Sequence, residues 1–191
     1  QLLLPQSAQE GGPAEMNARL TDPARRAELA AHVRRRWEEY YDGDGRRVVV
    51  SRAPDPRLNG RSIADIAAES GRGNTATGLT ATVLDLVARF PGQTDIYSIS
   101  HGMCEDDLAA ILRHPRTAVG SDSWWPRTPE EVPHPRAFGT FPRVLGRYAR
   151  EKGLFSTEEA VRRMTSLPAA RLGLSDRGVL REGAWADLVV F

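Results

Sequence analysis

The 191-residue sequence has a single cysteine, Cys104, and no long apolar run. One thiol can form neither an internal disulfide nor a thiolate metal cluster, which indicates a reducing, cytoplasmic setting. No apolar segment approaches the roughly 20 residues of a membrane-spanning helix, so we expect no membrane partner. The 26 basic side chains are matched by 25 acidic ones. Because a nucleic-acid binder needs a basic excess, we expect no nucleic-acid partner either.

The composition is otherwise that of a globular protein. Hydrophobic residues make up 40% of the chain and charged residues 27%, a balance that argues against long disorder. The sequence begins at Gln1 rather than at a methionine, and it ends at Phe191 inside an apolar run. Both ends therefore indicate a piece of a longer protein.

Apolar spacing and capping residues predict that helices alternate with short strands. The first long helix is expected to begin at Thr21 or Asp22 and to place Tyr40 on its apolar face. The predicted strands cover residues 47–51, 95–100, 117–120 and 186–191. This alternation is typical of a parallel α/β sheet or barrel. A complete eight-stranded α/β barrel needs about 250 residues, so this chain can hold only part of one.

Asp122 is the first candidate for chemistry. It follows the predicted strand 117–120, and Gly120 allows a tight exit from that strand. In α/β barrels, side chains at the carboxyl ends of the strands point into the active site. A carboxylate there can ligate a metal, accept a proton from a metal-bound water and return it to a leaving amine. From Gly-Ser-Asp alone, a loop aspartate that caps the next turn is the simpler interpretation.

The second candidate is the sequence His134-Pro135-Arg136. The rigid proline fixes the backbone between two polar side chains, and a guanidinium can bind a carboxylate through two parallel hydrogen bonds. The competing interpretation is an exposed loop in an arginine-rich protein. Nearby, Trp124 and Trp125 fit a substrate-facing wall as well as they fit surface packing.

The remaining metal-binding and nucleophilic residue types are scattered. Cys104 needs a neighbouring base to act as a nucleophile, and His101 is the one nearby candidate. Most single cysteines are small packed residues, so we discount this pair. A catalytic zinc needs three protein ligands. The four histidines are His32, His101, His114 and His134. They form no His-x-His pair and no i, i+4 pair, so the sequence offers no complete zinc site.

Several motifs together resemble the D-aminoacylase (N-acyl-D-amino-acid deacylase) family of the amidohydrolase superfamily. The most specific is His-Pro-Arg-Ala-Phe-Gly-Thr-Phe-Pro-Arg at 134–143, which follows Gly-Ser-Asp at 120–122. Pro-Ala-Ala-Arg at 168–171 and Ala-Asp-Leu-Val-Val at 186–190 are typical of the wider superfamily. The resemblance is strong from about residue 95 to the end and weaker before it.

The resemblance implies a metal-dependent (β/α)8 barrel with a small β-sandwich built from both chain ends. Residues 1–175 would be the carboxyl-terminal part of the barrel, and 176–191 would begin the sandwich segment. Asp122 would be the catalytic acid/base and a candidate metal ligand, while Arg136 and His134 would bind substrate. The cofactor would be zinc, held mainly by histidines and a Cys or modified Lys that would lie before Gln1. The family usually has glycine where this chain has Ser123, which alters the pocket wall.

The leading hypothesis is therefore hydrolysis of N-acyl-D-amino acids by metal-activated water. This chain would be the carboxyl-terminal segment of that enzyme, inactive alone, with the amino-terminal part of the same enzyme as its partner. One alternative is a non-catalytic fragment or interaction module, whose open strand edges would pair with another chain. A second alternative is a related amidohydrolase that acts on cyclic amides.

Overall fold

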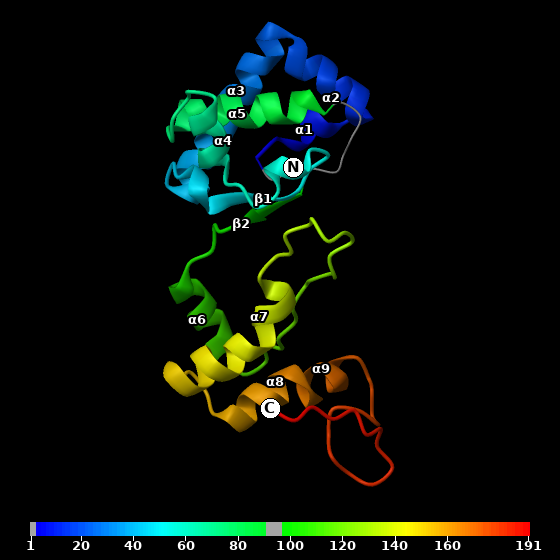
Figure 1. Cartoon of the computed structure of the whole chain (residues 1–191). Coiled ribbons are helices and arrows are strands. Elements are labelled where there is room, and N and C mark those ends of the chain that lie inside the picture. Colours follow the sequence, from blue (N-terminus) through cyan, green and yellow to red (C-terminus); the bar gives the residue numbers. More distant parts are fainter. Residues whose placement is uncertain (1–2, 91–96) are drawn as a thin grey trace. The chain divides into compact units, whose positions relative to one another are not determined.

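The computed structural model describes residues 3–90 and 97–191. They form two compact units, which Figure 1 shows in colours that follow the sequence. Unit 1 comprises Gln1–Gly102 and Pro126–Pro133, and unit 2 comprises Met103–Trp125 and His134–Phe191. Each unit has its own apolar core.

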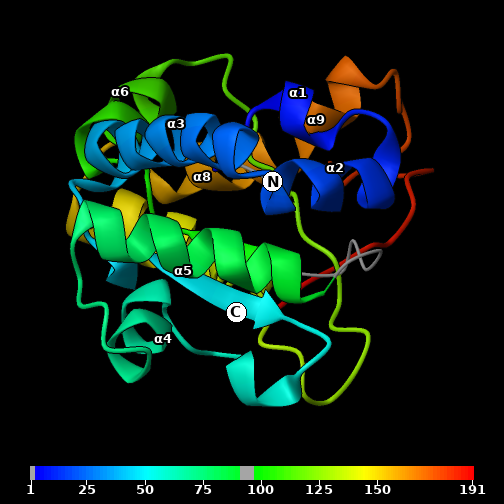
Figure 2. The same cartoon turned by 90° about the horizontal axis from the view of Figure 1, so that it is seen from above.

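Unit 1 is built from helices that cover a two-stranded sheet. Helices α3 and α5 lie side by side in both views of the molecule (Figures 1 and 2). The Asp22 side chain accepts a hydrogen bond from the Arg25 amide at 2.8 Å and so caps α3, as the sequence predicts. The elements are α1 (Gln6–Gln9), α2 (Gly12–Thr21), α3 (Pro23–Tyr41), η1 (Gly45–Arg47), β1 (Val48–Arg52), η2 (Pro56–Leu58), α4 (Ile63–Glu69), α5 (Ala76–Arg89) and β2 (Tyr97–Ser100).

The buried face of α3 differs by one residue from the prediction. Leu29, Val33 and Trp37 are buried, and the next buried member of this row is Tyr41 rather than the predicted Tyr40. Tyr40 is 50% exposed, because an i, i+4 row continues from Trp37 to Tyr41. The Tyr41 hydroxyl reaches the Ser100 hydroxyl at 2.5 Å and thereby ties α3 to the sheet.

The sheet of unit 1 corrects the expectation of parallel strands. Strands β1 and β2 pair antiparallel, with Val49 opposite Ile99, although the predicted positions of the two strands are confirmed. Residues 95–96 of the second predicted strand lie outside the described residues. Parallel sheets need several strands buried on both faces, and the described part of the chain supplies one strand pair. The barrel itself stays a prediction.

Unit 2 is helical, and its core joins three helices. The side chain of Ser156 accepts a hydrogen bond from the Glu159 amide at 3.2 Å and caps α8. The elements are α6 (Glu105–Arg113), α7 (Arg136–Arg143), the π-helix η3 (Val144–Glu151), α8 (Thr157–Met164) and α9 (Ser166–Arg171). The core residues are Leu112, Val144, Tyr148, Ala149 and Ala160.

Two predicted strands in unit 2 are wrong, since residues 117–120 and 186–191 form neither helix nor strand. A strand exists only when a partner supplies backbone hydrogen bonds. The Val119 amide donates instead to the Arg163 carbonyl at 3.0 Å, in a contact with α8. At the end of the chain, Val189 is 84% and Val190 100% exposed, so the apolar pattern of this segment finds no cover within the described residues.

The Glu105 carboxylate at the start of α6 collects donors from α7, the π-helix and the residue after it. Arg143 Nη2 lies 2.6 Å from Glu105 Oε1, and Lys152 Nζ lies 2.8 Å from Oε2. The Tyr148 hydroxyl donates at 3.2 Å, and Arg147 Nε lies 3.8 Å away. The hydrogen bond from Lys152, followed by that from Arg143, lowers the pKa of Glu105 to about 2. These contacts fix α6 against the helix that begins with Arg136.

We expect unit 2 to lose stability as the pH falls from about 4.5 to about 2. Because folding lowers the pKa of Glu105, its bonds stabilise the folded state above the unfolded-state pKa and are lost on protonation. The pKa of Glu159 is also lowered to about 2, first by its hydrogen bond with Arg162, so it contributes in the same range. Glu105→Gln should flatten the dependence of the melting temperature on pH, measured by circular dichroism. The exposed control Glu182→Gln should not, and equal slopes for the two variants would contradict the assignment.

Candidate active site

Arg136 is fixed at the first turn of α7 by local bonds. Pro135 precedes it with φ −52° and ψ −26°, values suited to the start of a helix. The Arg136 amide donates to His134 Nδ1 at 3.1 Å, and the Thr140 hydroxyl donates to the Arg136 carbonyl at 2.8 Å. The His-Pro-Arg sequence therefore acts as a helix start that places a guanidinium at the amino-terminal end of α7.

The same bond gives His134 a part in the local backbone structure. Its Nδ1 accepts a hydrogen bond from the Arg136 amide, so the imidazole orients the backbone at the start of α7.

Asp122 lies in irregular backbone before α7. Its φ is 47°, in the left-handed region, where aspartate is among the few residues other than glycine found with some frequency. The sequence predicts a tight turn at Gly120 after a strand, whereas in the structure Asp122 itself takes the left-handed conformation. Its side chain is 91% exposed, so the carboxylate is open to solvent in unit 2.

The structure brings Asp122 and Arg136 together. Arg136 Nη2 lies 3.1 Å from Asp122 Oδ2, and the Arg136 side chain is 33% exposed. Arg136 Nε is buried and has no hydrogen-bond partner among the described residues. A buried donor without a partner costs free energy, and a guanidinium is suited to bidentate binding of a carboxylate. The guanidinium therefore pairs with one carboxylate through Nη2, while its buried Nε is unsatisfied among the described residues.

Three exposed aromatic side chains lie on the same segments as this ion pair, and one of them is near Arg136. Arg136 Cζ lies 6.0 Å from the Trp124 ring centroid. The Trp125 and Phe138 ring centroids are 5.3 Å apart at an interplanar angle of 71°, the edge-to-face arrangement that aromatic pairs favour. Phe138 was missed by sequence reasoning, although it lies two residues after Arg136 within the most specific motif. We call Trp124, Trp125 and Phe138 the aromatic wall.

The other candidates play different parts. Cys104 caps α6 by accepting a hydrogen bond from the Asp107 amide at 3.4 Å. Within residues 3–90 and 97–191, no group of three or more His, Cys, Asp or Glu side chains could hold a metal ion. A catalytic zinc needs three protein ligands, so these residues do not make a zinc site by themselves.

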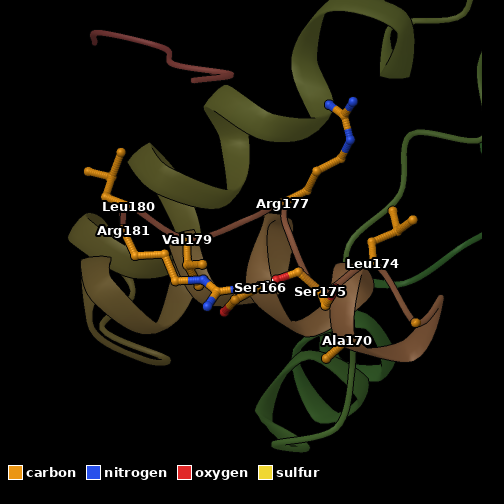
Figure 3. A pocket seen from close by; sticks show the side chains of 9 residues that line it. Ser166, Ala170, Leu174, Ser175, Arg177, Val179, Leu180 and Arg181 are labelled. Atoms are coloured by element: carbon orange, nitrogen blue, oxygen red, sulfur yellow. Dashed lines mark hydrogen bonds between the residues drawn. The ribbon is translucent and has the colours of Figure 1, made fainter. Parts of the chain in front are cut away.

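Unit 2 also contains a cavity of about 600 Å³ between α9 and the segment that follows it. Figure 3 shows Arg181 extending along this cavity toward Ser166, while Arg177 points away from it. Arg181 donates to the Ser175 carbonyl and Arg177 pairs with Asp187. The lining contains no residue of the ion pair or the aromatic wall, and we assign no chemistry to it.

Comparison with known proteins adds independent information. The model of the amidohydrolase family matches residues 13–191. The chain is 44% identical over 147 residues to D-aminoacylase of Alcaligenes xylosoxydans xylosoxydans, which covers 77% of this chain and 27% of that protein. It is 42% identical over 139 residues to N-acyl-D-glutamate deacylase of the same organism, covering 72% of this chain and 25% of that protein.

A solved structure agrees with these relatives. It is that of N-acyl-D-glutamate deacylase from Bordetella bronchiseptica, complexed with zinc and a phosphonate inhibitor that mimics the tetrahedral intermediate. The identity is 38%, the TM-score is 0.62, and the match covers 81% of this chain and 28% of that one.

The chain thus spans about a quarter of the length of the relatives it matches. In the described part, no helix is both long and apolar enough to cross a membrane. The family match extends over nearly the whole sequence and includes every residue of the Asp122–Arg136 site. The chain belongs to the amidohydrolase family.

Proposed function

We propose that this chain is the carboxyl-terminal part of an N-acyl-D-amino-acid deacylase. The observation that carries the proposal is the Asp122–Arg136 pair, in which a carboxylate suited to proton transfer lies 3.1 Å from a guanidinium suited to carboxylate binding. Two relatives are named D-aminoacylase and N-acyl-D-glutamate deacylase, and the substrates of this chain would be of that class, N-acyl-D-amino acids.

Arg136 would bind the α-carboxylate of the substrate. Its guanidinium presents parallel N–H groups in the plane that a carboxylate needs, and its Nε has no partner among the described residues. The substrate carboxylate would take the place that Asp122 occupies in the structure. Holding one substituent of the chiral carbon in this way restricts which enantiomer presents its acyl group to the reacting water.

Asp122 would then transfer the proton. Once its partner Arg136 binds the substrate, the freed carboxylate can accept a proton from the water that attacks the acyl carbonyl. The same proton then goes to the nitrogen as the carbon–nitrogen bond breaks, so that a carboxylic acid and an amine leave. Binding of the substrate carboxylate to Arg136 would therefore also free the Asp122 carboxylate to act as the base.

Zinc is the cofactor we propose for the complete enzyme, because the related D-glutamate deacylase was solved with zinc. The described residues offer no group of three ligands, so the ligands would come mainly from elsewhere in the enzyme, with Asp122 as one candidate. In that enzyme, residues 1–175 would belong to a (β/α)8 barrel and 176–191 would begin a β-sandwich. Residues 186–191 would become a strand there by pairing with a neighbour.

Arg136→Gln in the complete enzyme tests the proposal. We expect KM for an N-acetyl-D-amino acid to rise about 10- to 100-fold, because a hydrogen-bonded charge is worth about 1.5–3 kcal/mol. The corresponding N-acetyl-D-amino acid amide has no α-carboxylate, so its hydrolysis should change little. Steady-state kinetics on both substrates measures the difference, with the exposed Arg113→Gln as a control. Equal effects on acid and amide would refute carboxylate binding by Arg136.

A second outcome concerns the function itself. If the zinc-loaded complete enzyme turns over no N-acyl-D-amino acid but opens a cyclic amide, the deacylase assignment fails. The 191-residue chain alone should show neither stoichiometric zinc nor turnover, and both together would overturn its assignment as an incomplete part.

A further inference from the structure

A groove of about 310 Å³ lies between α3 and α5, the helices of unit 1 that lie side by side (Figures 1 and 2). Its apolar lining includes four alanines, which are Ala27, Ala30, Ala31 and Ala81. Packed helix axes are about 8–10 Å apart, and methyl groups are too short to fill the space between them. Small-molecule sites in proteins have volumes of about 300–1,000 Å³, so the groove is large enough to take a ligand.

Arginines of α3 give the groove a positive charge. Arg26 and Arg34 both line it, about two helical turns apart, and none of its described lining residues is acidic. Arg26 donates to the Leu20 carbonyl at 3.2 Å and pairs with Asp85, which also pairs with Arg72. Because Arg26 and Arg72 share one carboxylate, these side chains together hold an excess of positive charge, which attracts an anion.

The lining also contains a buried hydroxyl group without a hydrogen bond. Thr80 of α5 is 5% exposed, and its Oγ1 has no hydrogen-bond partner among the described residues. Leaving a buried hydroxyl unpaired is unfavourable. Thr82 of the same helix shows the usual solution, since its hydroxyl donates to the Gly78 carbonyl at 2.8 Å. A ligand oxygen in the groove would give Thr80 the partner that Thr82 already has.

The lining as a whole suits an anion that has an apolar part. Guanidinium groups and a hydroxyl bind a carboxylate, whereas the alanines and the buried Leu84 offer apolar surface to methylene groups. A water molecule takes up about 30 Å³ in the liquid, so the groove holds roughly ten atoms of that size. Inorganic phosphate has no apolar part and would leave the alanines uncovered.

We propose that the groove between α3 and α5 binds a carboxylate with a short aliphatic chain. The exposed Arg34 and the Thr80 hydroxyl hold the carboxylate, since Arg26 is already bonded to Asp85 and a backbone carbonyl, and the chain lies along the alanines. The groove lies in unit 1 and shares no residue with the pair of Asp122 and Arg136. The inference is therefore independent of the proposed deacylase function, and a binding measurement tests it without turnover.

The test uses hexanoate as the probe and saturation-transfer NMR on the complete zinc-loaded enzyme carrying Arg136→Gln, which removes the carboxylate-binding group assigned to the active site. Hexanoate should bind with a Kd of about 1 mM, as expected of so small a ligand, and the uncharged hexan-1-ol about tenfold more weakly. Adding Arg34→Gln should weaken hexanoate binding about tenfold or more. Arg35→Gln changes an exposed arginine of α3 outside the lining and should leave the Kd unchanged.

Thr80→Val separates ligand binding from stability. Valine has the shape of threonine but no hydroxyl, so the variant no longer buries an unpaired polar group, and its melting temperature should hold or rise. Hexanoate binding should nevertheless weaken about threefold to tenfold, because the carboxylate loses a donor. A loss of affinity at an undiminished melting temperature cannot come from unfolding.

Three results would overturn the inference. The first is that hexanoate does not bind the Arg136→Gln enzyme, as when another part of the complete enzyme fills the groove. The second is an affinity that neither Arg34→Gln nor Thr80→Val lowers, and the third is equal binding of hexanoate and hexan-1-ol. Each of them leaves the proposed deacylase function standing, because no residue of the groove takes part in it.

Discussion

Replacing Asp122 by asparagine is expected to lower kcat by about 10²- to 10⁴-fold, the usual contribution of a positioned acid/base group. Asparagine has the shape of aspartate and keeps a side-chain oxygen beside Arg136, so the arrangement of the two side chains, 3.1 Å apart in the native protein, should change little. It cannot accept a proton from water. The variant should therefore have a lower kcat while it still binds substrate.

The kinetic pattern separates this role from a structural one. Because asparagine competes less well than aspartate for Arg136, KM should stay level or fall when Asp122 is replaced. Asp106 is an exposed carboxylate on the first turn of α6, and Asp106→Asn should leave kcat within about twofold of native. A native kcat in Asp122→Asn, measured with the zinc-loaded complete enzyme, would remove Asp122 from the mechanism.

The largest effect on stability is expected at Arg163 of α8. Its side chain is 3% exposed and bonds to Glu159 at 2.8 Å. Its guanidinium also donates to the backbone carbonyls of Leu112 and His114 at the end of α6, and it lies 4.7 Å from the Phe155 ring centroid. Arg163 thus closes the carboxyl-terminal end of one helix with a side chain from another.

Arg163→Met should cost about 3 kcal/mol, because it leaves the buried carbonyl of Leu112 and the part-buried carbonyl of His114 without their charged donor. Glu159 keeps its bonds to Arg162, so the loss should concentrate on the contact of α6 with α8. Hydrogen exchange followed by mass spectrometry should show faster exchange in peptides of both helices and little change in unit 1. Arg150→Met changes an exposed arginine of the π-helix and should alter neither, and native protection in Arg163→Met would contradict this account.

The sequence predicted the helices better than the strands, for a physical reason. The starts of α3 and α8 are encoded locally, by Asp22 and Ser156 side chains that cap the amides three residues later. A strand forms only when it pairs with another segment, often far along the chain, and a local apolar pattern does not identify that segment. Residues 117–120 pack against α8 instead, and residues 186–191 form no strand pair with another part of the chain that the structure describes.

The candidate site was predictable in part. Asp122 and Arg136 stand in a motif specific enough to be named from the sequence, but their 3.1 Å contact depends on the left-handed backbone at Asp122. The place of Phe138 could not be deduced, because its contact with Trp125 spans an irregular loop. The donors around Glu105 could not be predicted from the sequence either, because they lie up to 47 residues away from Glu105 along the chain.

The ion pair has a consequence for how an anion reaches this surface. Because Asp122 is paired with Arg136, their two formal charges cancel, so this pair exerts little long-range attraction on a dissolved anion. If Arg136 binds a substrate carboxylate as proposed, binding would occur at contact distance, by exchange of one carboxylate for another. Such an exchange would conserve charge, and its rate would be less sensitive to ionic strength than steering by an open cationic patch.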